Sequence, residues 1–421
     1  MFKKPRGTRD FSSEEMQKRR YVEDTIRKTF QNFGYQEIQT PTFENLELFT
    51  MKSGEEIIEE IYSFEDKGGR KLALRPELTA PVIRFYVEKL QMEAKPLKLF
   101  YIGNCYRYDR PQKGRYREFT QAGCELIGTK TPEALAELIA MAYFMLKKTG
   151  LKNINLYIGD LTLLSTIFQK FNLSKKQQEY VRPLIDKEKW GELKDALSDF
   201  ELNDNEIDDF IEIIQTSDLE KIRKKIQEEN SAKKQLEKLI KIKRILVENF
   251  QITNSEIKMS IVRGLDYYTG TVFEIEAPVL GAEKQLCGGG TYQLIELFGG
   301  KETPTSGFAV GFDRTIVALE EEEKDFPTSK LDFFVIPVNN QVLDEATEIA
   351  QKLRFNNYSV DIDLKRRNMG KALKYADSKN AKKTIIVGPE ELEKQSVTIK
   401  DMETGEQKMV KISKIIDKLK K

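Results

Sequence analysis

The chain has 421 residues, with 69 Lys and Arg against 68 Asp and Glu, so its formal net charge is only +1. It contains no histidine, which excludes His-based catalytic triads, His metal ligands and His general bases. The three cysteines, Cys105, Cys124 and Cys287, form no CxxC pair, so we expect neither a structural zinc site nor a disulfide framework. No apolar run approaches the roughly 18 residues of a membrane span, and no apolar stretch follows the first basic residues, so we predict a cytoplasmic protein.

Helical and strand-like segments alternate in the first part of the chain. A stripe of apolar residues predicts a long helix that ends near Gly34, and a short strand then leads to Pro41. Two strand-like runs around Lys67-Gly68-Gly69 predict a hairpin. The predicted elements are helices at 14–33 and about 77–90, and strands at 35–38, 61–64, 71–74, 97–107 and 115–127.

The composition changes between about Lys175 and Phe250. Lys, Glu, Asp and Gln dominate there, glycine nearly vanishes, and apolar residues such as Leu236, Leu239 and Leu246 recur at helical spacing. We therefore predict a helical insertion at 172–252. Its charge indicates a solvated face rather than a nucleic-acid surface, although the sequence leaves both readings open.

A second change follows the acidic run at 320–323 and Pro327. Strand and helix patterns then alternate, which is typical of a small α/β domain with a largely parallel sheet. We predict a core domain at 1–325 and a separate domain at 330–421. The predicted elements here are strands at 333–337, 359–362 and 384–387 and helices at 343–355 and 369–379; strands at 257–262 and 271–277 end the core.

The stretch NCYRYDRPQKGRYREFTQ, residues 104–121, concentrates positive charge in a nearly neutral chain. Five cations and one acid, Asp109, lie between Arg107 and Arg117. Because side chains alternate along a strand, the odd positions share one face, and a hairpin would bring Arg107 and Asp109 beside them. The odd positions are Arg115, Arg117, Phe119, Gln121, Gly123 and Glu125.

This face combines guanidinium groups with an aromatic ring, a carboxylate and an amide. Arginine suits bidentate recognition of phosphate, and a ring such as Phe119 can stack on a base. A solvated basic hairpin that merely protects a sheet edge is the alternative. Phe119 and Gln121 on the arginine face favour the phosphate-binding interpretation.

Three glycine-containing stretches also indicate a ligand site. VRGLDYYTGTVFE at 262–274 places Arg263 before a tight turn and two tyrosines, which suits an anionic substrate. CGGGTYQLIELFGG at 287–300 allows close backbone approach to a ligand but matches neither a Walker loop nor GxGxxG. GFAVGFDR at 307–314 runs into a helix with Arg314 in its first turn, where a phosphate could bind. Ordinary turns with core tyrosines remain the alternative.

Together and in this order, these stretches resemble class II aminoacyl-tRNA synthetases. Pro41 after the long helix looks like motif 1, YRYD…GRYREF like motif 2 and GFAVGFDR like motif 3. RGLDYYTG and GGGTY look like the two signatures of the histidyl-tRNA synthetase family, and PRGTRDF and TGEQ fit it too. The second signature usually reads Gly-Arg-Tyr-Asp, whereas this chain has Thr291 and Gln293 on either side of Tyr292, and Thr120 replaces a residue that is often aromatic or His.

The resemblance implies an α+β catalytic domain with an antiparallel sheet flanked by helices, a helical insertion, and a C-terminal α/β anticodon-binding domain. It implies that Arg107 binds the α-phosphate of ATP, Arg314 the γ-phosphate, and that Phe119 stacks on adenine near Asp109. The residues that would surround the substrate histidine are Glu77, Thr79, Gln121, Arg263, Tyr267, Tyr268 and Tyr292.

The implied chemistry needs no protein histidine. The carboxylate of L-histidine attacks the α-phosphate of ATP, so catalysis rests on positioning and on stabilising charge by arginines and Mg²⁺. Arg107 and Arg263 are the candidate catalytic residues, and Glu125 is the candidate Mg²⁺ ligand.

The resemblance also implies tRNA(His) as a partner and a homodimer formed through the motif 1 region near Pro41. Gln112, Lys113 and Arg115 would meet the acceptor end of the tRNA. Basic residues near 365–374, including Arg366 and Arg367, would serve anticodon binding, although a solvated helix end is an alternative.

A regulatory or nucleic-acid-sensing protein built on an altered synthetase fold is the alternative function. The presence of residues 330–421 and of the intact RGLDYYTG stretch argues against a regulatory relative that lacks the last domain. The retained residues also argue against a fold that has lost its chemistry; they are Arg107, Phe119, Arg263 and Arg314.

Overall fold

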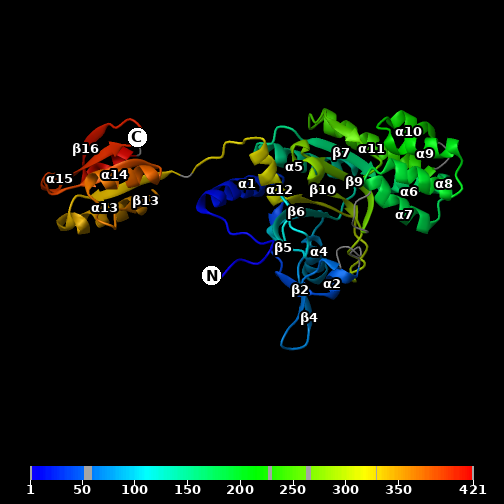
Figure 1. Cartoon of the computed structure of the whole chain (residues 1–421), viewed down its shortest axis with the longest axis horizontal. Coiled ribbons are helices and arrows are strands. Elements are labelled where there is room, and N and C mark those ends of the chain that lie inside the picture. Colours follow the sequence, from blue (N-terminus) through cyan, green and yellow to red (C-terminus); the bar gives the residue numbers. More distant parts are fainter. Residues whose placement is uncertain (1, 52–58, 226–229, 262–266, 329, 420–421) are drawn as a thin grey trace. The chain divides into compact units, whose positions relative to one another are not determined.

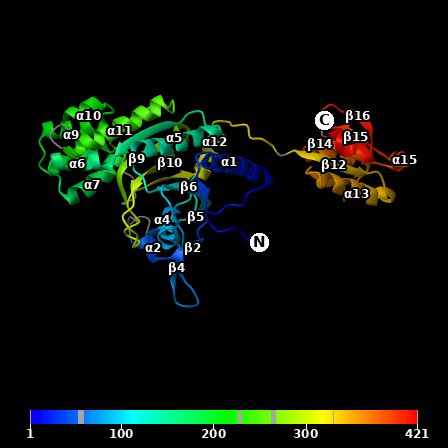
Figure 2. The same ribbon diagram turned by 180° about the vertical axis from the view of Figure 1, so that it is seen from behind.

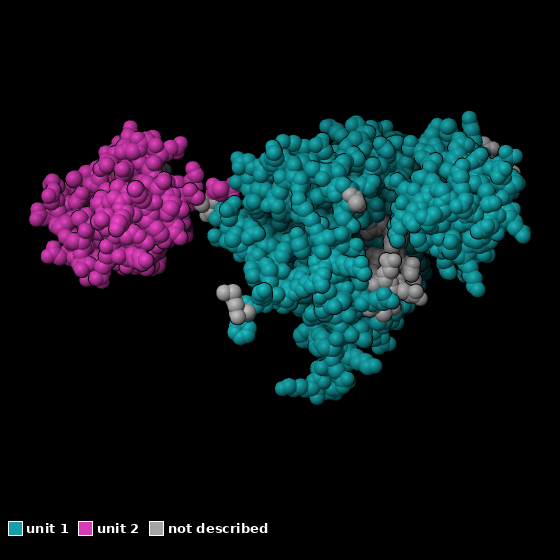
Figure 3. All heavy atoms as spheres, viewed as in Figure 1, with its two compact units in different colours: residues 1–326 teal, residues 327–421 magenta. Residues whose placement is uncertain are grey.

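The computed structural model describes residues 2–51, 59–225, 230–261, 267–328 and 330–419. The chain forms two compact units, Met1–Phe326 and Pro327–Lys421, which are coloured separately in Figure 3. Among the described residues, no helix is both long and apolar enough to cross a membrane.

An eight-stranded sheet forms the centre of the first unit, in the order β1-β5-β6-β11-β10-β9-β7-β8. The five neighbouring pairs from β5 to β7 are antiparallel, and only the outer pairs β1–β5 and β7–β8 are parallel. The predicted antiparallel sheet is therefore confirmed. Its strands are β1 (Gln36–Glu37), β5 (Leu97–Tyr106), β6 (Glu118–Ile127), β7 (Asn155–Asp160), β8 (Ser255–Ile257), β9 (Tyr268–Glu276), β10 (Gln285–Tyr292) and β11 (Thr305–Gly311).

Helices α1 (Ser13–Asn32), α5 (Pro132–Thr149) and α12 (Phe312–Glu321) cover one face of this sheet (Figure 1). The α1 helix starts at a capping box in which Ser12 and Glu15 bond each other's backbone N–H groups. Its buried stripe ends at Phe30, whose ring stacks on Phe100 of β5 and Phe308 of β11 at 4.8 and 5.8 Å between centroids.

The other face of the sheet is only partly covered, and the site described below lies there. Helix α4 (Thr79–Phe85) continues as a π-helical turn, Tyr86–Leu90, and packs against the strand residues Leu99 and Tyr101. Beside it lies a small antiparallel sheet in the order β2-β4-β3, which includes the predicted hairpin. Its elements are β2 (Phe43–Asn45), α2 (Glu47–Thr50), β3 (Ser63–Glu65) and β4 (Lys71–Leu74).

A run of helices separates β7 from β8, and it appears in green in Figures 1 and 2. The short strand β8 ends at Ile257, earlier than the predicted strand at 257–262, because the chain turns at Met259 and Ser260. The helices are α6 (Leu161–Lys170), α7 (Lys175–Asp186), α8 (Trp190–Asp199), α9 (Asp204–Gln215), α10 (Leu219–Lys225) and α11 (Asn230–Glu248).

The second unit is a five-stranded sheet in the order β13-β12-β14-β15-β16 with helices on both faces. Alternate residues of β12 pack on opposite sides, so Val335 contacts the α13 side and Phe334 the α14 side. β13, β12 and β14 are parallel, and the two strands that follow are antiparallel. The elements are β12 (Leu331–Pro337), α13 (Leu343–Arg354), β13 (Val360–Ile362), α14 (Met369–Ser378), β14 (Ala381–Val387), α15 (Pro389–Glu393), β15 (Ser396–Asp401), β16 (Gln407–Lys411) and α16 (Ile415–Leu419).

Candidate active site

A cavity of about 500 Å³ opens on the partly covered face of the large sheet. Its walls come from the β5–β6 hairpin, the start of α4, strands β9 to β11 and the first turn of α12. Most of the residues that the sequence singled out lie along it. They are Glu77, Thr79, Arg107, Asp109, Arg115, Phe119, Gln121, Glu125, Tyr267, Tyr268, Tyr292 and Arg314.

The pairing of β5 with β6 aligns the polar side chains of the hairpin. Cys105 pairs with Phe119 and Gly103 with Gln121, and beyond the ladder the Arg107 N–H donates to the Arg117 carbonyl at 2.9 Å. Phe119, Gln121 and Glu125 thus share the cavity face, as alternation predicts. Arg117 does not line the cavity, and its guanidinium instead lies 3.8 Å from the ring centroid of Tyr108.

Glu77 caps the N-terminus of α4. Its carboxylate accepts the backbone N–H groups of Thr79 and Ala80 at 2.6 and 2.8 Å. Burial raises the pKa of the Glu77 carboxyl, and these two hydrogen bonds oppose that shift. Gln121 is held nearby, because its side-chain carbonyl accepts the Leu78 N–H at 3.1 Å. This bond uses the side-chain carbonyl of Gln121, a residue that lines the cavity, and not its amide N–H groups.

Glu125 lies at the bottom of the cavity between two phenols. Its carboxylate accepts the Tyr101 O–H at 3.0 Å and the Tyr292 O–H on its other oxygen. Burial raises its pKa to about 8, so the group binds a proton far more readily than an exposed carboxyl. Gly307 is required here, since a Cβ at that position would lie 2.0 Å from the Glu125 Oε2 atom.

This environment does not fit the predicted role of Glu125 as a Mg²⁺ ligand. Both carboxylate oxygens already accept phenolic hydrogen bonds, and the side chain is 1 % exposed. Magnesium usually keeps several waters and is bound by ionised carboxylates, whereas burial disfavours the ionised form of this carboxyl and raises its pKa. Sequence reasoning also missed Tyr101, although Tyr101 and Arg107 lie at odd positions of the same strand run.

Three tyrosines form one wall of the same cavity. The ring centroids of Tyr267 and Tyr268 are 4.9 Å apart, and those of Tyr267 and Tyr292 are 5.4 Å apart. Such tilted and edge-on contacts form a rigid apolar surface with polar edges. The wall can therefore enclose a flat polar ring while the carboxyls provide directional hydrogen bonds.

The other end of the cavity is basic and aromatic. The Arg107 Nε atom donates to the Pro76 carbonyl at 2.9 Å, and its guanidinium carbon is 5.5 Å from the Phe119 ring centroid. Asp109 forms an ion pair with Arg115. Phe119 thus lies beside the Arg107 guanidinium in a cavity that Arg115 also lines, an arrangement that suits a base attached to phosphates.

Arg314 projects from the first turn of α12 and is engaged on three sides. It forms an ion pair with Glu283 at 2.7 Å and donates to the carbonyls of Gln285 and Gly114 at 3.2 and 3.4 Å. Burial lowers the pKa of the Arg314 guanidinium. Glu283, which the sequence did not single out, also accepts the Gln112 side-chain N–H at 3.0 Å.

The remaining predicted residues lie elsewhere. Arg263 falls outside the residues that the structure describes. Lys113 does not line the cavity and forms an ion pair with Glu321. In the second unit Arg366 is exposed, whereas Arg367 pairs with the buried Asp363. Among the described residues, no three acidic or cysteine side chains gather to hold a metal ion by themselves.

Comparison with known proteins gives one family. Residues 7–315 match the family model "Histidyl-tRNA synthetase", and residues 332–421 match "Anticodon binding domain". The chain is 45 % identical over 420 residues to a histidine–tRNA ligase of Methanocaldococcus jannaschii, with 99 % of each covered, and 43 % identical to that of Methanococcus maripaludis, with 99 % and 100 % covered. It also resembles the crystal structure of S. aureus histidyl-tRNA synthetase, with a TM-score of 0.74, 30 % identity and 99 % of each chain covered.

Proposed function

This chain belongs to the histidyl-tRNA synthetase family, and we propose that its cavity activates L-histidine with ATP and transfers the histidyl group to tRNA(His). The observation that carries this proposal is the joining, in one cavity of about 500 Å³, of a carboxyl–phenol pocket with an arginine–aromatic surface. The first is suited to an imidazole and the second to a nucleotide.

The histidine subsite would lie between Glu77, Gln121 and Glu125. A neutral imidazole has one N–H donor and one nitrogen acceptor, and it can use a carboxylate and a protonated carboxyl or amide together. Glu77 is oriented by its two backbone donors, and Glu125 by its two phenols. Tyr267 and Tyr268 would close over the ring, and Thr79 contacts the phenol of Tyr101 at 3.3 Å.

The nucleotide subsite would lie at the basic end. Phe119 would stack on adenine with Asp109 close by, Arg107 would bind the α-phosphate, and Arg314 would bind the γ-phosphate. Arg314 would exchange its ion pair with Glu283 for one with the phosphate, because the Glu283 side chain is itself partly exposed. Arg263 is proposed from the sequence as the second group that stabilises charge at the α-phosphate and the substrate carboxylate.

Two carboxylates other than the predicted ligand, Glu125, are better suited to magnesium. Glu274 and Glu283 both line the cavity near Arg314, and Mg²⁺ in nucleotide sites is commonly bound by one or two carboxylates together with phosphates. When bound there, the ion would neutralise charge on the phosphate oxygens. Glu274 accepts the Gln285 amide at 2.6 Å, which orients its carboxylate.

The chain's own residues need only orient the two substrates and stabilise the charge on the phosphate oxygens. The substrate carboxylate is already ionised, so no protein base is required for its attack on the α-phosphate. Arg107, tethered by Pro76, would hold the phosphate in line with that carboxylate, and Arg314 would hold the departing pyrophosphate. The absence of histidine from the chain is therefore compatible with the reaction.

Transfer RNA would meet both units. Gln112, Lys113 and Arg115 lie in the loop of the β5–β6 hairpin, where they would contact the acceptor end. Arg366 and Arg367 precede α14 in the unit that matches the anticodon-binding model. A homodimer formed near Pro41 and a cytoplasmic location remain part of the proposal on the strength of the family resemblance.

The regulatory or sensing alternative is not favoured. The chain matches histidine–tRNA ligases over nearly its whole length, including the second unit, at 41 to 45 % identity. Its cavity also retains the polar groups at both ends.

Histidine-dependent exchange of pyrophosphate into ATP, followed by charging of tRNA(His), tests the proposal. We expect exchange with L-histidine and not with the other amino acids, and charging of tRNA(His) but not of other tRNAs. A folded protein that binds tRNA but catalyses neither step would support the sensing alternative instead.

A further inference from the structure

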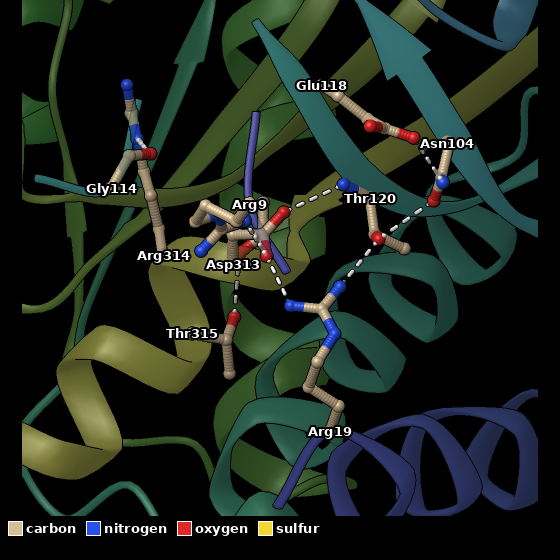
Figure 4. Close-up of polar contacts among 10 residues, drawn as sticks. Arg9, Arg19, Asn104, Gly114, Glu118, Thr120, Asp313, Arg314 and Thr315 are labelled. Atoms are coloured by element: carbon tan, nitrogen blue, oxygen red, sulfur yellow. Dashed lines mark hydrogen bonds and ion pairs between the residues drawn. The ribbon is translucent and has the colours of Figure 1, made fainter. Parts of the chain in front are cut away.

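A buried carboxylate, Asp313, lies directly before the proposed γ-phosphate ligand and joins three parts of the chain (Figure 4). Its side chain is 3 % exposed. It accepts a guanidinium N–H from Arg9 at 2.6 Å, another from Arg19 at 2.5 Å, and the backbone N–H of Thr120 at 2.7 Å. The three donors come from the N-terminal segment, from α1 and from β6.

The bond to Thr120 continues the connection between β6 and β11 beyond the end of their ladder. The last paired residues are Gln121 of β6 and Gly311 of β11, and α12 begins directly after Gly311. Phe119 and Arg314, the proposed adenine and γ-phosphate contacts, both lie past that point. Asp313 and Thr120 are their immediate chain neighbours, so this one hydrogen bond connects the two ATP contacts.

Arg9 and Arg19 support the hydrogen bond between Asp313 and Thr120 without lining the cavity themselves. The Arg19 guanidinium also donates to the Thr120 hydroxyl at 2.8 Å, and that hydroxyl donates to the Asn104 side chain at 3.1 Å. Arg9 lies over the ring of Tyr116, 3.3 Å from its centroid. Asp313, Thr120 and Tyr116 all line the cavity, whereas the two arginines do not.

We propose that Asp313 is a positioning residue for ATP, which ties the N-terminal segment and α1 to the junction of β6 and α12 and thereby holds Phe119 and Arg314 at a fixed separation. This inference rests on the proposed function of the cavity. The first residues of the chain then serve the nucleotide site through Arg9, without contacting the nucleotide themselves. The backbone N–H of Arg117 also holds the N-terminal segment in place, because it donates to the Gly7 carbonyl at 3.0 Å.

The alternative role for Asp313 is simple attachment of α1 to α12. The chain offers a matched control for that role, because Lys18 of α1 and Glu320 of α12 form an ion pair at 3.0 Å that is partly exposed and does not line the cavity. A variant at Lys18 weakens the same helix contact without touching the Asp313–Thr120 connection.

The test compares Asp313→Asn, Asp313→Glu and Lys18→Gln with the unaltered full-length protein. For Asp313→Asn we expect the KM for ATP in pyrophosphate exchange, and the calorimetric Kd for ATP, to rise about tenfold, because small displacements of positioned groups have effects of this size or more. The KM for histidine should stay within twofold. Asp313→Glu, which keeps the charge, should recover part of the loss, and Lys18→Gln should leave both constants unchanged.

Three results would overturn the inference. They are unchanged ATP constants in folded Asp313→Asn, equal losses for ATP and histidine, or the same effect in Lys18→Gln. If Asp313→Asn does not fold, Arg9→Gln removes only the outer guanidinium, and the same criteria apply. Absence of exchange in the unaltered protein would count against the proposed function, whereas the calorimetric comparison would still decide the role of Asp313.

Discussion

The phenol of Tyr101 donates to the carboxyl of Glu125 at 3.0 Å in the interior of the proposed histidine pocket. A second phenol, that of Tyr292, occupies the other oxygen. The pocket is therefore built around a buried carboxyl with a raised pKa rather than around a solvated anion.

The stability of the protein should depend on pH through Glu125. Its pKa rises from an ordinary value of 4.5 to about 8 on folding, so the folded protein binds a proton that the unfolded chain releases between these values. The free energy of unfolding should therefore fall as pH rises from about 4.5 to 8. The Glu125→Gln variant lacks this titration, and the difference in Tm between variant and unaltered protein should shift in the variant's favour across that range. Thermal melts at several pH values measure it; a difference that stays constant would refute the raised pKa.

Gly307 should not tolerate a side chain. A Cβ there would lie 2.0 Å from Glu125 and 2.4 Å from the Cys124 carbonyl oxygen, which is backbone and cannot move aside cheaply. Gly307→Ala should lower the free energy of unfolding by about 1–3 kcal/mol, the range for overpacked cores. Gly191→Ala is the control, because no atom lies within 4 Å of its added Cβ. Urea titrations of both variants decide the matter, and equal stabilities would contradict the predicted collision.

Glu77 should affect histidine far more than ATP. The Glu77→Gln variant replaces a carboxylate that is already oriented by Thr79 and Ala80, so a charged hydrogen bond to the imidazole is lost. We expect kcat/KM for histidine to fall about 10- to 100-fold, with the Kd for ATP unchanged. Glu88→Gln, an exposed carboxylate further along the same helical run, serves as the control. A parallel loss of ATP binding would indicate damage to α4 instead.

Removal of the second unit should separate the two steps. The first unit has its own core and contains the whole cavity, so deletion of residues 330–421 should spare histidine-dependent pyrophosphate exchange and greatly reduce tRNA charging. Exchange and charging assays on the truncated protein, with circular dichroism as a control for folding, test this division. Loss of exchange in a folded truncated protein would show that the first unit depends on the second.

Arg263 should be essential for adenylate formation. Its position directly before a glycine turn and a tyrosine pair suggests a contact with the substrate carboxylate and the α-phosphate, although the residue lies outside the described part of the chain. Arg263→Ala should reduce exchange by at least about a hundredfold, as expected for loss of a group that stabilises developing charge. Exchange within tenfold of the unaltered protein, with an unchanged circular dichroism spectrum, would remove Arg263 from the mechanism.

Local patterns in the sequence determined much of this protein. The alternation of side chains along residues 115–125 placed Phe119, Gln121 and Glu125 on one face, and the structure has them along one cavity. The order of the glycine-containing stretches identified the family, and the change in composition after the acidic run marked the second unit. Such features depend on neighbours within a few residues, so they can be read from the chain itself.

Tertiary structure alone decided what surrounds each of these side chains. Glu125 could serve as a metal ligand by residue type, but two phenols from β5 and β10 and the lack of solvent give it a raised pKa. Asp313 reads in the sequence as an ordinary acid beside Arg314, yet its partner Arg9 lies 304 positions away. Contacts over such distances, and the burial that sets a pKa, arise only when the sheet and its helices assemble, because no local pattern records which side chains will meet.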